Sequence, residues 1–201
     1  MIRTSALAIP FFVPLLALAG CKPPPTDEAT ARSALVEDRG APSLPIESPD
    51  AINAIWAESR EPGRILYGNP GETPMIALTC IEDEQEPRIR FTRYALADEG
   101  ASALLALIGN GHIARLPVEA TDRGGYFLWQ GEFPATSPDL EVLTGTRDFT
   151  ATIPGAGLVE VHASERPAEL VEACRALVED VEAAPEEIDQ LEFAGEDAAA
   201  F

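Results

Sequence analysis

The densest basic group in the chain consists of Arg88, Arg90 and Arg93, in a sequence with 14 basic and 34 acidic residues. Arg88 and Arg90 fall on the polar face of an expected strand, where guanidinium groups could hold a carboxylate or a phosphate by forked hydrogen bonds. Pairing with nearby acids is the alternative. Tyr126 belongs to the densest aromatic cluster, and strand alternation separates it from the face that carries Trp129. Arg88, Arg90, Arg93 and Tyr126 are therefore the candidate ligand-binding residues.

Other residues of catalytic type do not form a recognisable pattern. His112 and His162 each stand alone on an expected strand, with no second ligand at metal spacing. The chain has no phosphate-binding loop, dinucleotide glycine motif or Gly-x-Ser-x-Gly elbow. The acidic turn at 82–86 could hold calcium weakly, but it lacks the alternation and glycine of a calcium loop, which favours a solvated turn. We expect a protein without enzymatic activity, cofactor or metal; a pocket that joins a histidine to a carboxylate would instead indicate a hydrolase.

Cys80 and Cys174 are expected to form a disulfide. If the chain is exported, as its amino-terminal segment predicts, it enters an oxidising compartment, where an even pair of cysteines usually bridges. The absence of a Cys-x-x-Cys motif and of a neighbouring histidine argues against a redox or nucleophilic role. Closing a loop of about 95 residues would restrict the unfolded chain by roughly 4–5 kcal/mol. Cys80 lies on the apolar face of an expected strand and Cys174 in the apolar stripe of an expected helix, so a helix packed on a sheet would bring them together.

The amino-terminal segment has the pattern of a signal peptide, expected to span residues 1–20. Arg3 is the only charge before Cys21, and an apolar run of about 13 residues follows it. That run is shorter than the ~20 residues that a membrane-spanning helix needs. A short positive segment followed by a short apolar one is typical of a secretory leader.

The residues Leu18-Ala19-Gly20-Cys21 resemble the lipobox of bacterial prolipoproteins. The resemblance implies that Cys21 accepts a diacylglycerol, becomes the first residue after cleavage and can receive a further acyl chain such as palmitate. Two or three chains, at ~0.8 kcal/mol per buried methylene, would anchor the protein stably to the lipid bilayer. An ordinary leader cut nearby is the alternative, with Cys21 left free or paired.

The same resemblance implies a cell-envelope location with the folded domain in the periplasm. Lys22 stands where lipoproteins kept at the inner membrane commonly carry an aspartate, so the outer membrane is expected. We expect residues 21–47 to be a proline-rich disordered tether, residues 48–182 a globular domain and residues 183–201 an acidic tail. A frayed, solvated tail is the simpler interpretation of that last segment, and binding to a partner is the alternative.

The charge balance limits the partners. The formal charge is −20, and loss of Arg3 with the leader would make it −21. Such a surface disfavours nucleic acid and anionic lipid headgroups. It is compatible with a cationic ligand, although solubility alone also explains it.

The expected fold class is α+β, with an antiparallel β-meander or sandwich of six to eight short strands and a carboxy-terminal amphipathic helix packed on it. Alternating apolar residues and turn signals predict the strands. Two Ser-Pro-Asp sequences, at 48–50 and 137–139, predict short helices. The expected strands are 65–67, 75–82, 88–94, 102–108, 112–119, 126–133, 149–153 and 158–161, and the final helix begins after Ser164.

The order of these elements is similar to that of several small exported bacterial families. Ile76-Ala77-Leu78-Thr79-Cys80, the strand pair at 149–161 and Leu170-Val171-Glu172-Ala173-Cys174 resemble the invasion-associated locus B proteins and a lipoprotein group associated with type VI secretion. The segment 123–129 is similar to the lipoprotein inhibitors of C-type lysozyme. These resemblances imply an accessory envelope protein that binds another, unidentified envelope component. The alternative is an inhibitor of a cationic cell-wall hydrolase.

Overall fold

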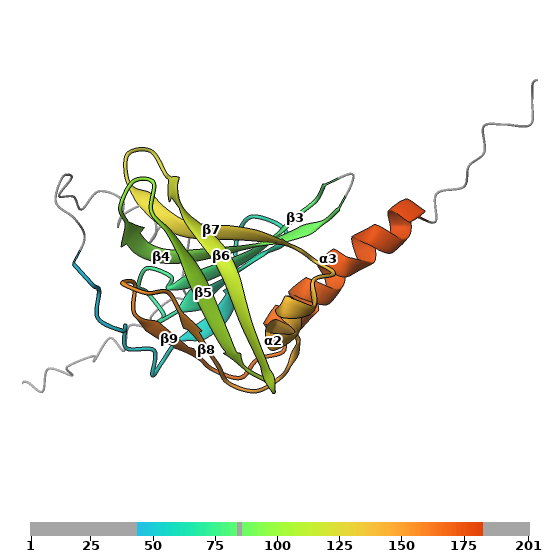
Figure 1. Cartoon of the computed structure of the whole chain (residues 1–201). Helices are drawn as coiled ribbons and strands as arrows, with labels where there is room; N and C mark the ends of the chain where they lie inside the picture. Colours follow the sequence, from blue (N-terminus) through green and yellow to red (C-terminus); the bar gives the residue numbers. More distant parts are fainter. Residues whose placement is uncertain (1–43, 84–85, 183–201) are drawn as a thin grey trace, which may run out of the picture.

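Nine antiparallel strands form one sheet in the computed structural model, which describes residues 44–83 and 86–182. The strand order is β1-β2-β3-β4-β7-β6-β5-β8-β9, and Figure 1 shows that the sheet curls strongly. The strands are β1 (Ile55–Glu58), β2 (Arg64–Gly68), β3 (Ile76–Ile81), β4 (Arg88–Ala97), β5 (Ser102–Gly109), β6 (His112–Asp122), β7 (Phe127–Pro134), β8 (Phe149–Thr152) and β9 (Leu158–Val161). Three helical segments complete the described chain: η1 (Pro138–Leu140), α2 (Glu141–Thr144) and α3 (Arg166–Glu182).

The α+β class is confirmed, but the strand count and the meander are not. The described chain has nine strands where six to eight were predicted, and β4 pairs with β7 rather than with β5. Strand β5 pairs instead with β6 and β8. The pattern of alternation identifies each strand but does not determine which edges meet. The chain between β4 and β5 therefore crosses the end of the sheet.

The helix predicted after Ser48 is also wrong. Ile52 N donates to Asp50 Oδ1 in a turn, and the chain then enters β1, where Trp56 lies opposite Tyr67. Ser48 caps no helix, because its Oγ accepts a hydrogen bond from Leu158 N at 3.0 Å. The partner of Ser48 is thus 110 residues away, and a local capping signal cannot reveal such a contact.

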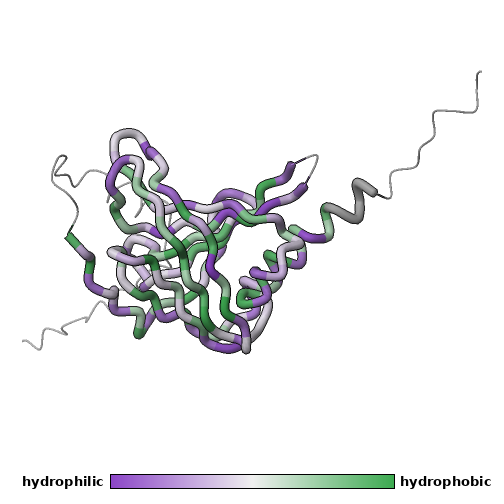
Figure 2. The backbone as a smooth tube through the Cα atoms, viewed as in Figure 1, coloured by the Kyte–Doolittle hydropathy of each residue, from purple (hydrophilic) through white to green (hydrophobic). Residues whose placement is uncertain are grey.

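The other two helix starts agree with prediction. Ser137 Oγ accepts from Asp139 N at the start of η1, and Ser164 Oγ accepts from Arg166 N at the start of α3. Alternate residues of the strands, together with one side of α3, fill the interior of the curl. Figure 2 shows the resulting alternation of hydrophilic and hydrophobic residues along the strands.

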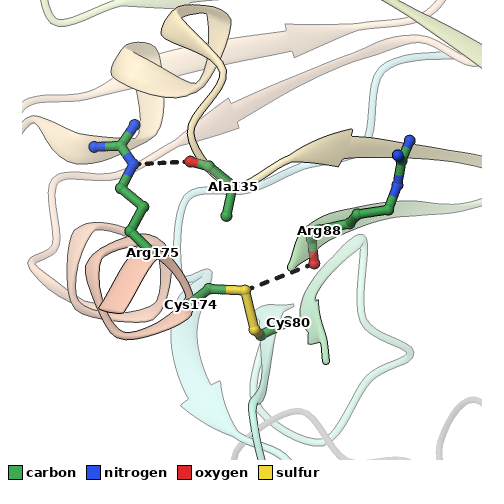
Figure 3. Close-up of a disulfide and its surroundings, with 5 residues drawn as sticks. All are labelled: Cys80, Arg88, Ala135, Cys174 and Arg175. Carbon is green, nitrogen blue, oxygen red and sulfur yellow. Dashed lines mark hydrogen bonds between the residues drawn. A yellow bond between two sulfur atoms is a disulfide. The ribbon is translucent and has the colours of Figure 1, made fainter. Parts of the chain in front are cut away.

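The predicted disulfide between Cys80 and Cys174 is present and joins β3 to α3, as Figure 3 shows. Cys174 is almost fully buried beside Val171, which packs α3 against the inner face of the sheet. In the same region, Arg175 Nε donates to Ala135 O at 2.8 Å. These contacts fix the helix across one end of the curled sheet.

Side chains connect β9, the last strand in the sheet order, to residues at the opposite end of the sheet. The buried Tyr67 hydroxyl on β2 donates to Glu160 O of β9 at 2.9 Å and accepts from His162 N at 3.0 Å. His162 Nε2 lies 2.8 Å from Ala51 O. Strand β9 therefore meets the first part of the sheet through a hydroxyl and an imidazole instead of a continuous backbone ladder.

None of the helices in the described residues is long and apolar enough to cross a bilayer. The expected leader, Cys21 and the acidic tail at 183–201 lie outside the described residues, as does most of the expected tether. Near the end of the expected tether, Ile46 N donates to Gly155 O at 2.8 Å. The described chain therefore begins beside the turn between β8 and β9.

Candidate functional site

The two candidate arginines on β4 lie side by side on the outer face of the sheet. Ile89 and Phe91 turn into the core, so alternation directs Arg88 and Arg90 outward. Both contact Glu132 on the neighbouring strand β7. Arg90 Nη2 lies 2.6 Å and Arg90 Nε 2.7 Å from Glu132 Oε1.

Arg88 reinforces this pair in two ways. Its Nη2 donates to Glu132 O at 2.8 Å, and its Nε lies 3.9 Å from Glu132 Oε2. Pairing with a local acid, the alternative weighed for these arginines, is therefore present. Two guanidinium groups nevertheless share one carboxylate, so this part of the sheet carries a surplus positive charge.

Arg93 does not join this basic group. It is an odd number of residues from Arg90, so its side chain points into the core, where only 5% of it is exposed. Arg93 Nη1 donates to Met75 O at 3.0 Å and Nη2 to Ala156 O at 3.2 Å. Burial lowers the pKa of Arg93 to about 10. The residue joins β4 to the β8–β9 turn and is not placed to meet a ligand.

Tyr126 also lies apart from Arg88 and Arg90, in the turn between β6 and β7. Its carbonyl oxygen accepts from Arg123 N at 2.8 Å, and its side chain is half-buried. Asp122 shapes the same turn, because its Oδ1 accepts hydrogen bonds from the backbone N–H groups of Gly124 and Gly125. These bonds, that from Gly125 above all, hold the pKa of Asp122 below its usual value.

The outer face holds a polar groove of about 430 Å³ between β4, β7 and β6. We call it the β6–β7 groove. Its lining residues are Arg90, Pro117, Glu119, Thr121, Arg123, Gln130, Gly131 and Glu132. Arg90 is the predicted candidate that lines it. The other lining residues were not predicted as ligand-binding residues, because a polar outer face has the same sequence pattern as any solvated strand.

The floor of the groove is ordered by a buried amide. Gln130 Nε2 donates to Thr92 Oγ1 at 2.7 Å, and only 9% of Gln130 is exposed. This bond uses a donor and leaves the amide oxygen available as an acceptor. Gly131 continues the floor. A Cβ atom there would lie 2.6 Å from Pro117 O and 2.5 Å from Phe133 Cζ, so any other residue would force the strands apart.

The opposite wall of the groove comes from alternate residues of β6. Glu119, Thr121 and Arg123 follow one another at intervals of two, as outer-face residues of a strand and its turn should. Neither the Glu119 carboxylate nor the Arg123 guanidinium forms a salt bridge with another described residue. The groove thus has the paired Arg90 and Glu132 on one wall, and Glu119 and Arg123 on the other.

A second cavity, of about 300 Å³, lies where the β1–β2 turn meets the start of α3. Four of the five charged residues that line it pair within the cavity, and Glu169 is the fifth. Arg166 Nη1 lies 3.1 Å from Glu58 Oε1, and Arg64 forms a salt bridge with Glu61 at 2.5 Å. This internal pairing makes it a weaker candidate than the β6–β7 groove.

Neither histidine lines either of these cavities. His162 is bonded to the backbone, and His112 begins β6 at the far end from the groove. Among residues 44–83 and 86–182 there is no group of three histidine, cysteine or acidic side chains that could hold a metal ion.

Comparison with protein-family models, with curated proteins and with solved structures finds no match for the chain. The interpretation of the site therefore rests on its own geometry.

Proposed function

We propose that the chain is a membrane-anchored periplasmic lipoprotein that binds another component of the cell envelope and has no enzymatic activity. The observation that carries the binding role is the β6–β7 groove. Its ordered floor and its charged walls, contributed by three strands, are suited to hold a polar ligand. Neither histidine reaches it, and it offers no nucleophile with an adjacent base.

The pairing of the cysteines supports the lipid anchor. The sequence contains three cysteines, and the bond between Cys80 and Cys174 occupies two of them. Cys21 is then the one thiol left for modification. The disulfide also fits an exported protein, because such bonds persist in oxidising compartments. These observations support anchoring at Cys21, and the prediction for Lys22 adds the outer membrane as the location.

The anchor is tested by replacing Cys21 in the full chain. Wild-type protein should sediment with the outer-membrane fraction and carry the mass of its acyl chains. A Cys21→Ala variant should lose both properties. Membrane association of the variant equal to that of the wild type would contradict the anchor and leave the groove open to a separate test.

The binding role is tested by placing a photo-crosslinking residue at Glu119 in intact cells. We expect a discrete crosslinked product from this position. A crosslinker at Glu160, an exposed acid on β9 outside the groove, is the matched control. Identical products from both positions would contradict a ligand site in the groove.

A second function is favoured by the charge. A formal charge of −20 would attract a cationic cell-wall hydrolase and make the protein its inhibitor. Saturable inhibition of lysozyme that weakens as salt is added would support this function. Full lysozyme activity at low salt in the presence of excess protein would exclude it for that enzyme.

A further inference from the structure

Arg93 is the one charged side chain among the buried residues of the described chain. The other two buried polar residues, Thr92 and Gln130, bond to each other on the outer face of the sheet. No carboxylate within the described chain pairs with the Arg93 guanidinium, whose two hydrogen bonds go to neutral carbonyl oxygens. Burying a charge without a counter-charge is costly. A negative charge beside Arg93, inside the curled sheet (Figure 1), would therefore be stabilised.

Two donors without a partner project into this part of the interior. Arg93 Nε and Trp129 Nε1 are both buried and have no hydrogen-bond partner among the described residues. Arg93 and Trp129 lie directly opposite each other on β4 and β7. They share the parity of Phe91 and Phe133, which belong to the core, so both side chains leave the sheet on its inner face. Opposite residues of this kind have Cβ atoms about 4.5–5.5 Å apart.

This pair of donors favours an anion over a water molecule. One acceptor about 3 Å from each nitrogen can join donors up to about 6 Å apart, a span that opposite positions on adjacent strands allow. A water molecule would accept from both donors, but its own two hydrogens would then need acceptors. Met75 O already accepts two hydrogen bonds, from Tyr94 N and Arg93 Nη1. An anion accepts from both donors, donates nothing and supplies the missing negative charge.

The neighbouring side chains limit the kind of anion. Ile76 lies opposite Arg93 on β3, and Ala120 lies opposite Trp129 on β6. Neither side chain carries a polar atom. A divalent oxyanion such as sulfate would need further donors for its remaining oxygens, whereas a halide ion needs none. The row of residues across the sheet therefore selects a small monovalent anion.

We infer that the interior of the curled sheet holds one halide ion, chloride in ordinary buffers, between Arg93 Nε and Trp129 Nε1. Arg93 is not placed to meet a ligand that stays at the surface, so the ion is enclosed with the core. It balances the guanidinium charge while Arg93 keeps its bonds to Met75 O and Ala156 O. The ion thereby stabilises the contact between β4 and the β8–β9 turn. This site is separate from the β6–β7 groove and does not depend on the proposed binding function.

The first test is urea unfolding of the purified full chain in detergent, with sodium chloride replaced by sodium methanesulfonate at constant ionic strength. An ion that binds only the folded state lowers the unfolding equilibrium constant about tenfold for each tenfold rise in its concentration above the dissociation constant. We expect this dependence on chloride in the wild type and its loss in Trp129→Phe, which removes the indole N–H. Trp56→Phe is the matched control, because it removes the other buried indole N–H without a described partner. Stability independent of chloride in the wild type, or equal dependence in Trp129→Phe, would overturn the inference.

The second test needs no variant, so it applies even if Trp129→Phe does not fold. Crystals of the wild type grown in sodium bromide should show an anomalous scattering peak in contact with Arg93 Nε and Trp129 Nε1. A water molecule at that position, without anomalous signal, would overturn the inference.

Discussion

Replacing Arg93 by methionine separates the two opposing effects of a buried arginine. The guanidinium group is 5% exposed and has no salt bridge within the described chain. Its pKa falls to about 10 because burial disfavours the charged form, which corresponds to about 3 kcal/mol of unfavourable charge burial. Against this stand two hydrogen bonds from a charged donor, together about 3–6 kcal/mol. The hydrogen bonds therefore offset the cost of burying the charge, and their net contribution to the free energy of unfolding is about 0–3 kcal/mol.

The two carbonyl acceptors of Arg93 decide whether Arg93→Met raises or lowers the free energy of unfolding. Met75 O also accepts from Tyr94 N at 3.0 Å, so it keeps a partner when Arg93 is replaced. Ala156 O has no other described donor and would be left without one, at a cost of roughly 1–3 kcal/mol. Methionine fills most of the volume and adds little strain. We therefore expect Arg93→Met to lower the free energy of unfolding by about 1–3 kcal/mol at neutral pH.

Urea denaturation measures this difference, with Arg115→Met as the control. Arg115 is exposed on β6, and its replacement should change the free energy of unfolding by less than about 0.5 kcal/mol. An Arg93→Met protein as stable as the wild type, or more stable, would refute the conclusion that Arg93 stabilises the contact between β4 and the β8–β9 turn.

The pH dependence gives an independent check on Arg93. Its pKa is lower in the folded state than in the unfolded state, so the unfolded chain binds more protons above pH 10. The cost of burying the charge is complete below that pKa and diminishes as the pH rises through it. The deficit of Arg93→Met relative to wild type should therefore grow by about 1 kcal/mol between about pH 9 and pH 11. A constant difference over this range would mean that burial does not lower the pKa.

Three further changes test the fold. Cys174→Ala should reduce the free energy of unfolding by roughly 4–5 kcal/mol in the loop-entropy model, because the bridged residues are 94 apart; reductant should destabilise the wild type but not the variant. Tyr67→Phe should cost about 1–3 kcal/mol by leaving buried backbone groups unpaired, and hydrogen exchange at His162 N should accelerate. The pKa of Glu141 lies below its usual value, mainly because of the hydrogen bond with Thr144. The ionised carboxylate therefore stabilises the folded state above the usual pKa, and this stabilisation is lost as the pH falls through the pKa of the folded state. The stability difference between wild type and Glu141→Gln should therefore shrink in acid.

The sequence predicts well those features that depend on residue periodicity. Cys80 and Cys174 could be paired because each lies on the apolar side of its own element, one with a strand period and one with a helix period. The same alternation predicts that Arg93 points to the opposite face of the strand from Arg88 and Arg90. Arg88 and Arg90 share one parity, and Arg93 has the other. Distance in sequence groups the three arginines, whereas parity separates Arg93 from the other two.

Features that depend on distant partners could not be predicted in this way. Trp56 belongs to a strand because Tyr67 pairs with it, although Ser48 and Pro49 ahead of it favour a helix start. The pairing of β4 with β7 joins strands that are not consecutive in the sequence, so no local pattern in either strand indicates it. Tertiary contacts of this kind override local propensity.

The β6–β7 groove depends on both local residues and distant pairing, and two residues in the sequence explain why the β6–β7 ladder ends beside it. The ladder between β6 and β7 runs from Asp122 opposite Phe127 to Glu119 opposite Gln130 and then stops. Pro117 has its carbonyl oxygen close to Gly131, and the proline nitrogen has no hydrogen to continue the ladder. Gly131 permits this close approach, while the polar side chains on either side of it face outward. The end of the ladder therefore follows from a proline and a glycine on neighbouring strands, and charged side chains line the groove beside it.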